Sequence, residues 1–299
     1  MGSSSVLYKR KTPLIVFLVP AFAFLIVFLY YPFVQNIINS FSDITGLGSA
    51  SKGVNDPWYV NYTALFADPK LRTALWNTII LTICTIVFQV GIALILALLV
   101  DSIRVGAQLF RTLYFFPIVI SATALGLMFN LIFLYNGGML NQLLMKLGLI
   151  TENIDWKDSE HFRLTMLSPV MWQYVGFYFV ILVTGLNNIS PELYEAAALD
   201  GCTGFAKVRY ITLPLLHNVL CTCLVLAITG ALKVFDLPWV MFGAGMPQDQ
   251  GWLTGTYMYD QTFNRGNVDY GSTISILIVV LGVVLSNVSN RVFKARDDV

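Results

Sequence analysis

Residues 76–100 read WNTIILTICTIVFQVGIALILALLV, and this stretch decides the fold class. It contains no Asp, Glu, Lys or Arg, and it exceeds the roughly 20 apolar residues that cross a bilayer as a helix. Lipid offers no hydrogen-bond partner to a backbone N–H or C=O, so the segment has to pair these groups internally. The stretch therefore predicts a transmembrane α-helix.

Similar runs recur along the chain and predict further spans near 13–35, 109–135, 166–187, 214–241 and 270–293. The composition agrees, since 57% of the residues are hydrophobic and 12% are charged, against about 25% charged residues in a soluble domain. Mean hydropathy is +0.71. The sequence lacks the ten-residue segments of alternating hydrophobicity that are typical of a transmembrane β-barrel. We expect a single all-α membrane domain over residues 1–299, with about six transmembrane helices and a loop at 188–213 between the fourth and fifth.

The N-terminus carries Lys9, Arg10 and Lys11 before an apolar run from Pro13 to Pro32, which superficially resembles a signal peptide. The run is longer than the 7 to 15 residues of a signal core, and no small-x-small cleavage site follows it promptly. We interpret it as an uncleaved first helix.

Positive charge predicts the orientation, because cytoplasmic loops are enriched in Lys and Arg. With a cytoplasmic N-terminus, ten such residues fall inside, namely Lys9, Arg10, Lys11, Arg104, Arg111, Lys207, Arg209, Arg291, Lys294 and Arg296. Seven fall outside, namely Lys52, Lys70, Arg72, Lys146, Lys157, Arg163 and Arg265. We expect both termini, and the 188–213 loop, in the cytoplasm.

Net charge and cysteines exclude some classes of function. A net charge of +1 gives no basic field for nucleic acid. The cysteines are Cys84, Cys202, Cys221 and Cys223. Their positions in or beside helices argue against a disulfide framework. The Cys221-x-Cys223 pair leaves a metal site open in principle, but nothing Cys-rich or His-rich accompanies it, and we expect no bound metal.

The 188–213 loop predicts a short helix outside the membrane. Ser190 is a candidate N-cap, Pro191 suits the first helical position and Glu192 favours the helix N-terminus. Ala196 to Leu199 propagate the helix, and Gly201 ends it. An ordinary loop helix explains this composition on its own.

The spacing of the residues in this loop is more specific than its composition. Glu195-Ala196-Ala197 is followed by three residues, Gly201, nine further residues and then Ile211-Thr-Leu-Pro214. This pattern resembles the Glu-Ala-Ala motif of binding-protein-dependent ABC importer permeases. Other stretches resemble the carbohydrate-uptake branch of that family, over nearly the whole chain. They are Leu25 to Phe41, Asn61 to Asn77-Thr78, Arg111 to Pro117, Gly137-Gly-Met-Leu-Asn141 and Phe235-Asp-Leu237. One departure is Gly243-Ala-Gly-Met-Pro247, where the family often has Gly-Gly-Pro.

The resemblance implies the type I ABC importer permease architecture and a location in a bacterial or archaeal cell (inner) membrane. It implies a coupling helix at about 191–201 that docks on a separate ATPase, with Glu195, Ala196, Ala197, Asp200, Gly201 and Pro214 as the coupling residues. Glu195 would make the polar contact, and Gly201 would permit the sharp turn. The implied partners are a second permease, a dimer of ATPases, an extracytoplasmic solute-binding protein, a sugar or oligosaccharide, and membrane lipid.

The chain is expected not to be an enzyme, because it has no Gly-x4-Gly-Lys-Ser/Thr loop and so cannot hydrolyse ATP alone. We expect no cofactor in this chain; ATP and Mg²⁺ would bind to the partner ATPase.

Polar and aromatic residues on two spans are candidates for the solute path. Lys233 and Asp236 lie three residues apart and therefore share a face of the fifth helix, so they form either an ion pair or part of a polar cavity. Gln173, Tyr174 and Phe177 recur on the fourth span, where aromatic faces and an amide suit a sugar, and where lipid or helix packing is the alternative. The resemblance favours the cavity for all five residues.

Two rival classes stay open. One is an ion-coupled secondary transporter or channel for a small polar solute; against it, the spans hold few acidic residues besides Asp236 and show no inverted repeat. An intramembrane enzyme lacks a catalytic constellation, since His161 and His217 are the only histidines. The sequence does not specify the solute.

Overall fold

The computed structural model of the chain describes residues 12–101 and 106–292. Within these ranges the regular structure is helical, apart from two isolated β-bridges, Ser42 with Val54 and Thr45 with Asn267. The α-helices are α1 (Thr12–Leu25), α2 (Tyr31–Ser40), α3 (Val60–Ala67), α4 (Pro69–Cys84), α5 (Gly91–Asp101), α6 (Ala107–Val119), α7 (Ala122–Ile132), α8 (Met139–Lys146), α9 (Phe162–Asn187), α10 (Pro191–Leu199), α11 (Gly204–Lys207), α12 (Leu213–Leu215), α13 (His217–Ala231), α14 (Asp236–Phe242), α15 (Thr254–Tyr259) and α16 (Val268–Val292).

Short π-helical segments join several of these helices into longer rods. One joins α1 to α2 (η1, Ile26–Tyr30) and another joins α4 to α5 (η2, Thr85–Val90). Five helical stretches are long and apolar enough to cross a membrane: Leu14–Ser40, Pro69–Asp101, Phe162–Asn187, His217–Phe242 and Val268–Val292. The count becomes six if the bent pair α6 and α7 forms one span.

The bent pair differs from the straight span expected at 109–135. Helices α6 and α7 meet at 93°. Pro117 removes one backbone donor near the end of α6, and Ile120 is extended, with ψ at 134°. The side chain of Ser121 then caps α7 by accepting from the amide of Ala124 at 3.2 Å. A new helix start therefore lies inside the apolar run.

The chain divides into two compact units. The first comprises residues 1–67 and 261–277, including α2, α3 and the first part of α16. Its contacts include ring pairs of Phe41 with Trp58 and Tyr62 as well as polar pairs. Asn36 donates to Ser275 at 3.0 Å and Asn61 donates to Asp269 at 3.2 Å. The apolar window of Leu14–Ser40 has no buried residue, so its hydrophobic surface is available to lipid.

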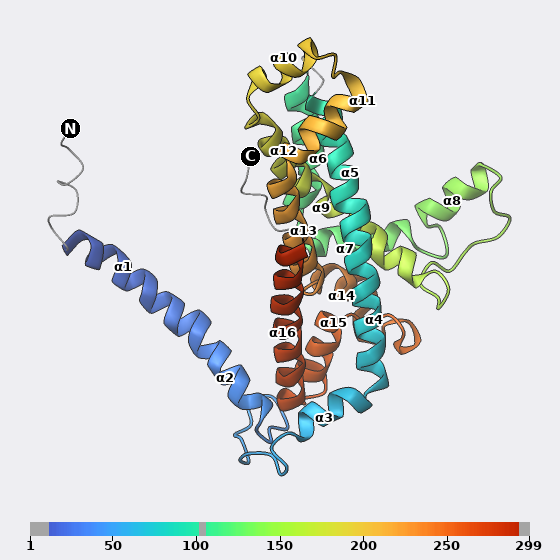
Figure 1. Cartoon of the computed structure of the whole chain (residues 1–299). Coiled ribbons are helices and arrows are strands. Elements are labelled where there is room, and N and C mark those ends of the chain that lie inside the picture. Colours follow the sequence, from blue (N-terminus) through green and yellow to red (C-terminus); the bar gives the residue numbers. More distant parts are fainter. Residues whose placement is uncertain (1–11, 102–105, 293–299) are drawn as a thin grey trace. The chain divides into compact units, whose positions relative to one another are not determined.

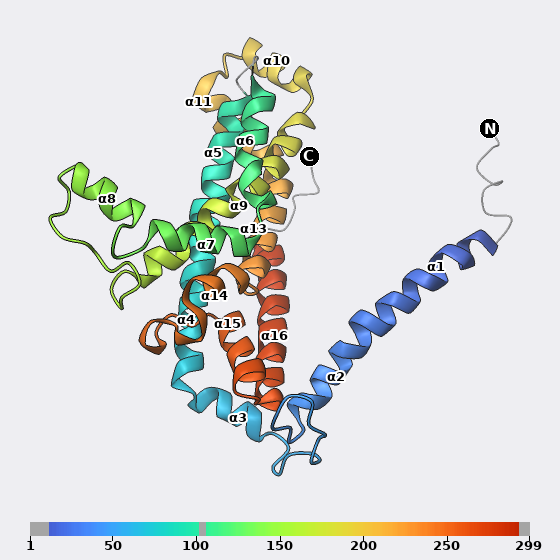
Figure 2. The ribbon, with the colours of Figure 1, turned by 180° about the vertical axis from the view of Figure 1, so that it is seen from behind.

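The second unit comprises residues 68–260 and 278–299. Its core packs α9 against α5 and α6, with Phe179 and Leu182 fully buried. Gly176 lets α9 approach α6, because a Cβ there would overlap the carbonyl oxygen of Tyr114. Figures 1 and 2 show α10 and α11 at one end of the rods formed by α5, α6 and α9.

Some sequence predictions lie outside the described residues. These are the charges assigned to the inside at Lys9, Arg10, Lys11, Arg104, Lys294 and Arg296, and the last residue of the 270–293 span. The remaining expected spans overlap the helices above, although the stretch Pro69–Asp101 begins seven residues before the expected 76–100 span and Leu14–Ser40 ends five residues after the expected 13–35 span; the third span is bent and the fifth is broken.

Candidate transport cavity and coupling loop

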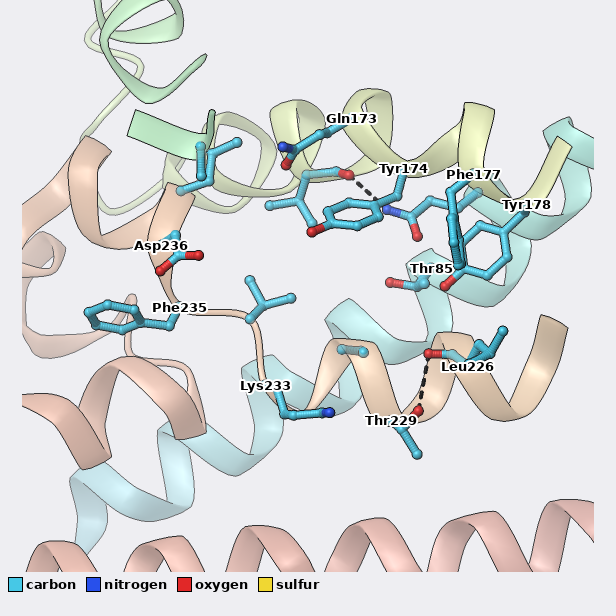
Figure 3. Close-up of a pocket in the computed structure, with 17 residues that line it drawn as sticks. Thr85, Gln173, Tyr174, Phe177, Tyr178, Leu226, Thr229, Lys233, Phe235 and Asp236 are labelled. Carbon is cyan, nitrogen blue, oxygen red and sulfur yellow. Dashed lines mark hydrogen bonds between the residues drawn. The ribbon is translucent and has the colours of Figure 1, made fainter. Parts of the chain in front are cut away.

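A cavity of about 350 Å³ lies between η2, α9 and the junction of α13 with α14. All five of the solute-path residues expected from the sequence line it. They are Gln173, Tyr174, Phe177, Lys233 and Asp236. Figure 3 shows Gln173, Tyr174 and Phe177 on α9, facing the segment that carries Lys233, Phe235 and Asp236.

The fifth span breaks at this cavity. Helix α13 ends at Ala231 and α14 begins at Asp236. Phe235, with φ at −141° and ψ at −58°, departs from helical geometry between them. Pro238 fits the first turn of α14, where its missing N–H would have no partner in any case. Irregular backbone inside a span is tolerated where it is buried in protein or lines a cavity.

The break corrects the expectation that Lys233 and Asp236 share a helix face. Lys233 lies in a turn, the non-helical residues Val234 and Phe235 separate it from Asp236, and Figure 3 shows the two side chains leaving the connecting segment in different directions. The ion pairs found in the described part of the chain do not include this pair. Both side chains are exposed, and both line the cavity. Both charges therefore lie at the cavity wall.

An aromatic cluster holds the broken segment in place. The ring of Phe235 lies 4.5 Å from that of Tyr259 and 5.5 Å from that of Trp239, between centroids. Trp239 and Tyr259 meet edge to face at 4.8 Å. Such pairs contribute about 0.5–1.5 kcal/mol each beyond area burial. The connecting segment is thus fixed at the cavity wall by α14 and α15.

Sequence reasoning missed polar cavity residues on the second span. Thr85 and Gln89 lie in η2, and their side chains are 4% and 2% exposed. Gln89 donates through Nε2 to the carbonyl of Val170 on α9 at 2.7 Å. An amide and a hydroxyl inside an apolar run are themselves a signal, because lipid penalises unpaired polar groups. Tyr178 and Thr229 also line the cavity.

The cavity offers chemistry suited to a polyhydroxylated solute. Tyr174 and Phe177 present aromatic faces, Gln173 an amide, Lys233 a cation and Asp236 a carboxylate. Aromatic faces stack on the apolar C–H faces of such molecules, while the other groups donate to or accept from hydroxyls. Neither a nucleophile–base pair nor a metal-ligand cluster is found among the described residues that line it.

The second candidate element is α10 with its C-terminal turn. Ser190 caps the helix by accepting from the amide of Glu192 at 3.3 Å. At the other end the amide of Cys202 donates to Ala197 at 2.8 Å and that of Gly201 donates to Ala198 at 3.1 Å. This is a Schellman motif, and Gly201 supplies its left-handed residue with φ at +77°.

The loop presents both acidic and apolar groups. Glu195 and Asp200 are exposed, as is Ala196, whereas Ala197 is 6% exposed and packs inward. Leu199, Phe205 and Tyr210 are 91%, 81% and 73% exposed. The coupling residues expected from the sequence did not include these three. Pro214 lies in α12, one turn before α13 begins.

A lysine in the segment between α8 and α9 connects α7 to α14 through hydrogen bonds. Lys157 donates through Nζ to Asn130 Oδ1 at 2.6 Å and to the carbonyl of Met241 at 3.0 Å. Burial lowers the pKa of Lys157, and Asp155 opposes that shift. The hydrogen bonds keep the α14 side of the cavity attached to the loop before α9.

Comparison with known proteins decides the class. The model of the binding-protein-dependent transport system inner membrane component family matches residues 89–297. The chain belongs to this family. The family prediction made from the Glu-Ala-Ala spacing is therefore confirmed, and the chain is a transport subunit of the membrane.

Curated relatives match the permease along most of its length. The probable ABC transporter permease protein YurN of Bacillus subtilis is 32% identical over 281 residues, covering 93% of this chain and 94% of the relative. The arabinooligosaccharides transport system permease protein AraP of the same organism is 31% identical over 293 residues, covering 96% and 90%. The lactose transport system permease protein LacF of Rhizobium radiobacter is 29% identical, covering 90% of each chain.

A solved structure shares the fold. A chain of a bacterial ABC transporter involved in the import of the acidic polysaccharide alginate superposes with a TM-score of 0.83 at 21% identity, covering 97% of this permease and 98% of that chain. A second structure of a bacterial alginate ABC transporter, in complex with an alginate pentasaccharide-bound periplasmic protein, gives 0.81 at 21% identity. The expected all-α importer-permease fold is confirmed.

Proposed function

We propose that this permease forms the membrane path of an ATP-driven importer for a sugar or oligosaccharide. The observation that carries the proposal is the convergence of Gln173, Tyr174, Phe177, Lys233 and Asp236 on one cavity at a broken helix. Relatives named for arabinooligosaccharides and lactose support the solute class.

The partners follow from the family. A second permease completes the path, a pair of ATPases binds ATP and Mg²⁺, and an extracytoplasmic binding protein delivers the solute. The alginate transporter complex with its periplasmic protein supports the last of these. The chain itself lies in a bacterial or archaeal inner membrane with both termini in the cytoplasm, as its Lys and Arg distribution favours.

Coupling runs through α10 and the turn after it. Leu199, Phe205 and Tyr210 are large, exposed apolar residues on the same loop as the exposed Glu195 and Asp200, and exposed apolar residues of this kind suit a groove on another subunit. Closure of the ATPases around ATP would move α10, and the α9 and α13 helices on either side would carry that motion to the cavity. Binding of ATP to one state thereby shifts the permease between two conformations.

Two variants of α10 test the coupling role. Glu195→Lys reverses the charge at the docking surface, and Gly201→Asp strains the left-handed turn. Both should abolish uptake while membrane insertion and the amount of protein stay normal. Ala198→Ser, an exposed position on the same helix, serves as the control. Normal uptake by both variants at normal protein level would overturn the assignment.

A further inference from the structure

A second hollow, outside the transport cavity, lies between α4 and α9. It has a volume of about 640 Å³ and is lined by Arg72, Thr73, Leu75, Trp76 and Ile79 of α4, Arg163 of α9, and Gln250 before α15. It shares no lining residue with the transport cavity. We define these seven residues as the arginine groove.

The two guanidinium groups of the arginine groove carry uncompensated charge. Neither forms an ion pair with a carboxylate in the described ranges of the chain. The carboxylates that flank α4 serve other partners. Asp68 caps α4 and accepts from the Tyr257 hydroxyl at 2.6 Å, and Asp249 pairs with Lys70 at 2.7 Å. The seven lining residues of the arginine groove include two cations and no carboxylate, so the groove favours an anionic ligand.

The exposed face of α4 changes from cationic to apolar along its length. Arg72, Trp76, Ile79 and Ile83 are spaced by four, three and four residues, which places them on one helix face. Trp76, Ile79 and Ile83 are 60%, 49% and 56% exposed. A phospholipid has the same order of chemistry: a phosphate, an interfacial region and an acyl chain.

The position along the helices fits the surface of a bilayer. Arg72 lies in the first turn of α4 and Arg163 is the second residue of α9, so both stand where a predicted membrane span begins. Tryptophan is enriched at this interfacial level, and arginine side chains extend toward headgroups there. A ligand in the groove would reach hydrocarbon within two turns of α4.

We propose that the arginine groove binds one phospholipid with an anionic headgroup, its phosphate held by Arg72 and Arg163. Guanidinium groups donate paired hydrogen bonds to phosphate oxygens, and the Gln250 amide adds a further donor. One acyl chain lies along Trp76, Ile79 and Ile83. A phospholipid of net charge −1 balances the groove better than a zwitterionic one, so the site distinguishes phosphatidylglycerol from phosphatidylcholine.

Native mass spectrometry of the assembled transporter in detergent tests the proposal, with phosphatidylglycerol or phosphatidylcholine titrated in. The wild-type complex should retain one phosphatidylglycerol more tightly than phosphatidylcholine. Arg72→Ala with Arg163→Ala should weaken that retention roughly tenfold or more, since two charge-assisted contacts are lost. Arg72→Lys with Arg163→Lys keeps the charge without the paired donors and should fall between. Lys146→Ala, an exposed cation on α8, should change nothing.

Three results would overturn the proposal. One is equal retention of phosphatidylglycerol by the wild-type and double-alanine complexes. Another is displacement of the lipid by millimolar inorganic phosphate, which would make the groove a site for free anions. The third is loss of solute-binding-protein docking in the double-alanine variant in lipid-free detergent, which would make it a protein-docking surface.

Discussion

Lys233, in the break between α13 and α14, and Asp236, the first residue of α14, line the same cavity and form no ion pair with each other. This relationship separates two accounts of the fifth span. A paired Lys and Asp would neutralise each other and serve stability. Two charges that line one cavity without pairing with each other would instead be available to a solute.

Charge exchange therefore distinguishes recognition from pairing. Lys233→Gln and Asp236→Asn should each raise the solute concentration for half-maximal uptake about tenfold, the effect of one lost charge-assisted hydrogen bond. The exchange variant Lys233→Asp with Asp236→Lys should not restore uptake. Thr222→Val, on α13 and outside the cavity lining, is the control. Recovery of uptake by the exchange variant would establish an ion pair instead.

Gly176 sets the distance between α9 and α6. A Cβ at this position would overlap the Tyr114 carbonyl, so Gly176→Val should lower the free energy of unfolding by about 2–3 kcal/mol through overpacking. Thermal unfolding in detergent, with the amount of inserted protein, measures the effect. Gly91→Ala is the matched control, because a Cβ there meets no atom within 4 Å. Equal stability of the two variants would refute the close contact.

Asn77 fastens the segment before α15 to α4. Its amide donates to the carbonyls of Gln250 at 2.6 Å and Trp252 at 3.0 Å, and its side chain is 2% exposed. Asn77→Leu leaves both carbonyls unpaired, so the free energy of unfolding should fall by about 2 kcal/mol. Proteolysis within 243–252 should become faster. Asn287→Leu makes the same exchange at an exposed position of α16 and should have little effect.

Acid pH should release the turn before α9. The backbone N–H of His161 is the main group that lowers the pKa of Asp158, opposed by partial desolvation and assisted by the His161 ring and the Glu160 amide. A lowered folded-state pKa means that the carboxylate stabilises the fold above its unfolded pKa of about 3.9 and that this contribution is lost as pH falls through the lower folded value. The unfolding temperature of wild type should therefore exceed that of Asp158→Asn at pH 6.

That difference should shrink as the pH falls below about 4 and disappear once the pH is below the lowered folded-state pKa of Asp158, because a protonated Asp and an Asn are both neutral. Glu152→Gln, an exposed substitution in the same loop, should show no comparable trend. A difference between wild type and Asp158→Asn that stays constant from pH 6 down to about pH 2 would contradict the assignment.

Much of the fold follows from the length and polarity of the apolar runs, because the bilayer fixes both. The run at 76–100 lies within the long helix over Pro69–Asp101. The run at 109–135 is bent by the sequence from Pro117 to Ser121, where one backbone donor is missing and a capping side chain follows. Mean hydropathy does not reveal such a cap, because a membrane-spanning run tolerates a single Ser as well as an Ala.

The cavity was partly visible in the sequence. Gln173, Tyr174 and Phe177 stand out because an amide among aromatics is unusual in a lipid-facing helix. Gln89 reaches the cavity wall only because α9 passes beside η2, and sequence periodicity does not report which helices are neighbours. The contact of Gln173, Tyr174 and Phe177 with a solute stays a prediction, as does the coupling role of Glu195.

Uptake with a catalytically dead ATPase tests the central claim most directly. Cells carrying this permease, its partner subunits and an ATPase variant that binds ATP without hydrolysing it would be supplied with the labelled solute that the binding protein recognises. We predict that accumulation of the solute stops while the ion gradients remain intact. Accumulation that continues in this strain, and collapses when the proton or sodium gradient is dissipated, would contradict the account and identify an ion-coupled transporter.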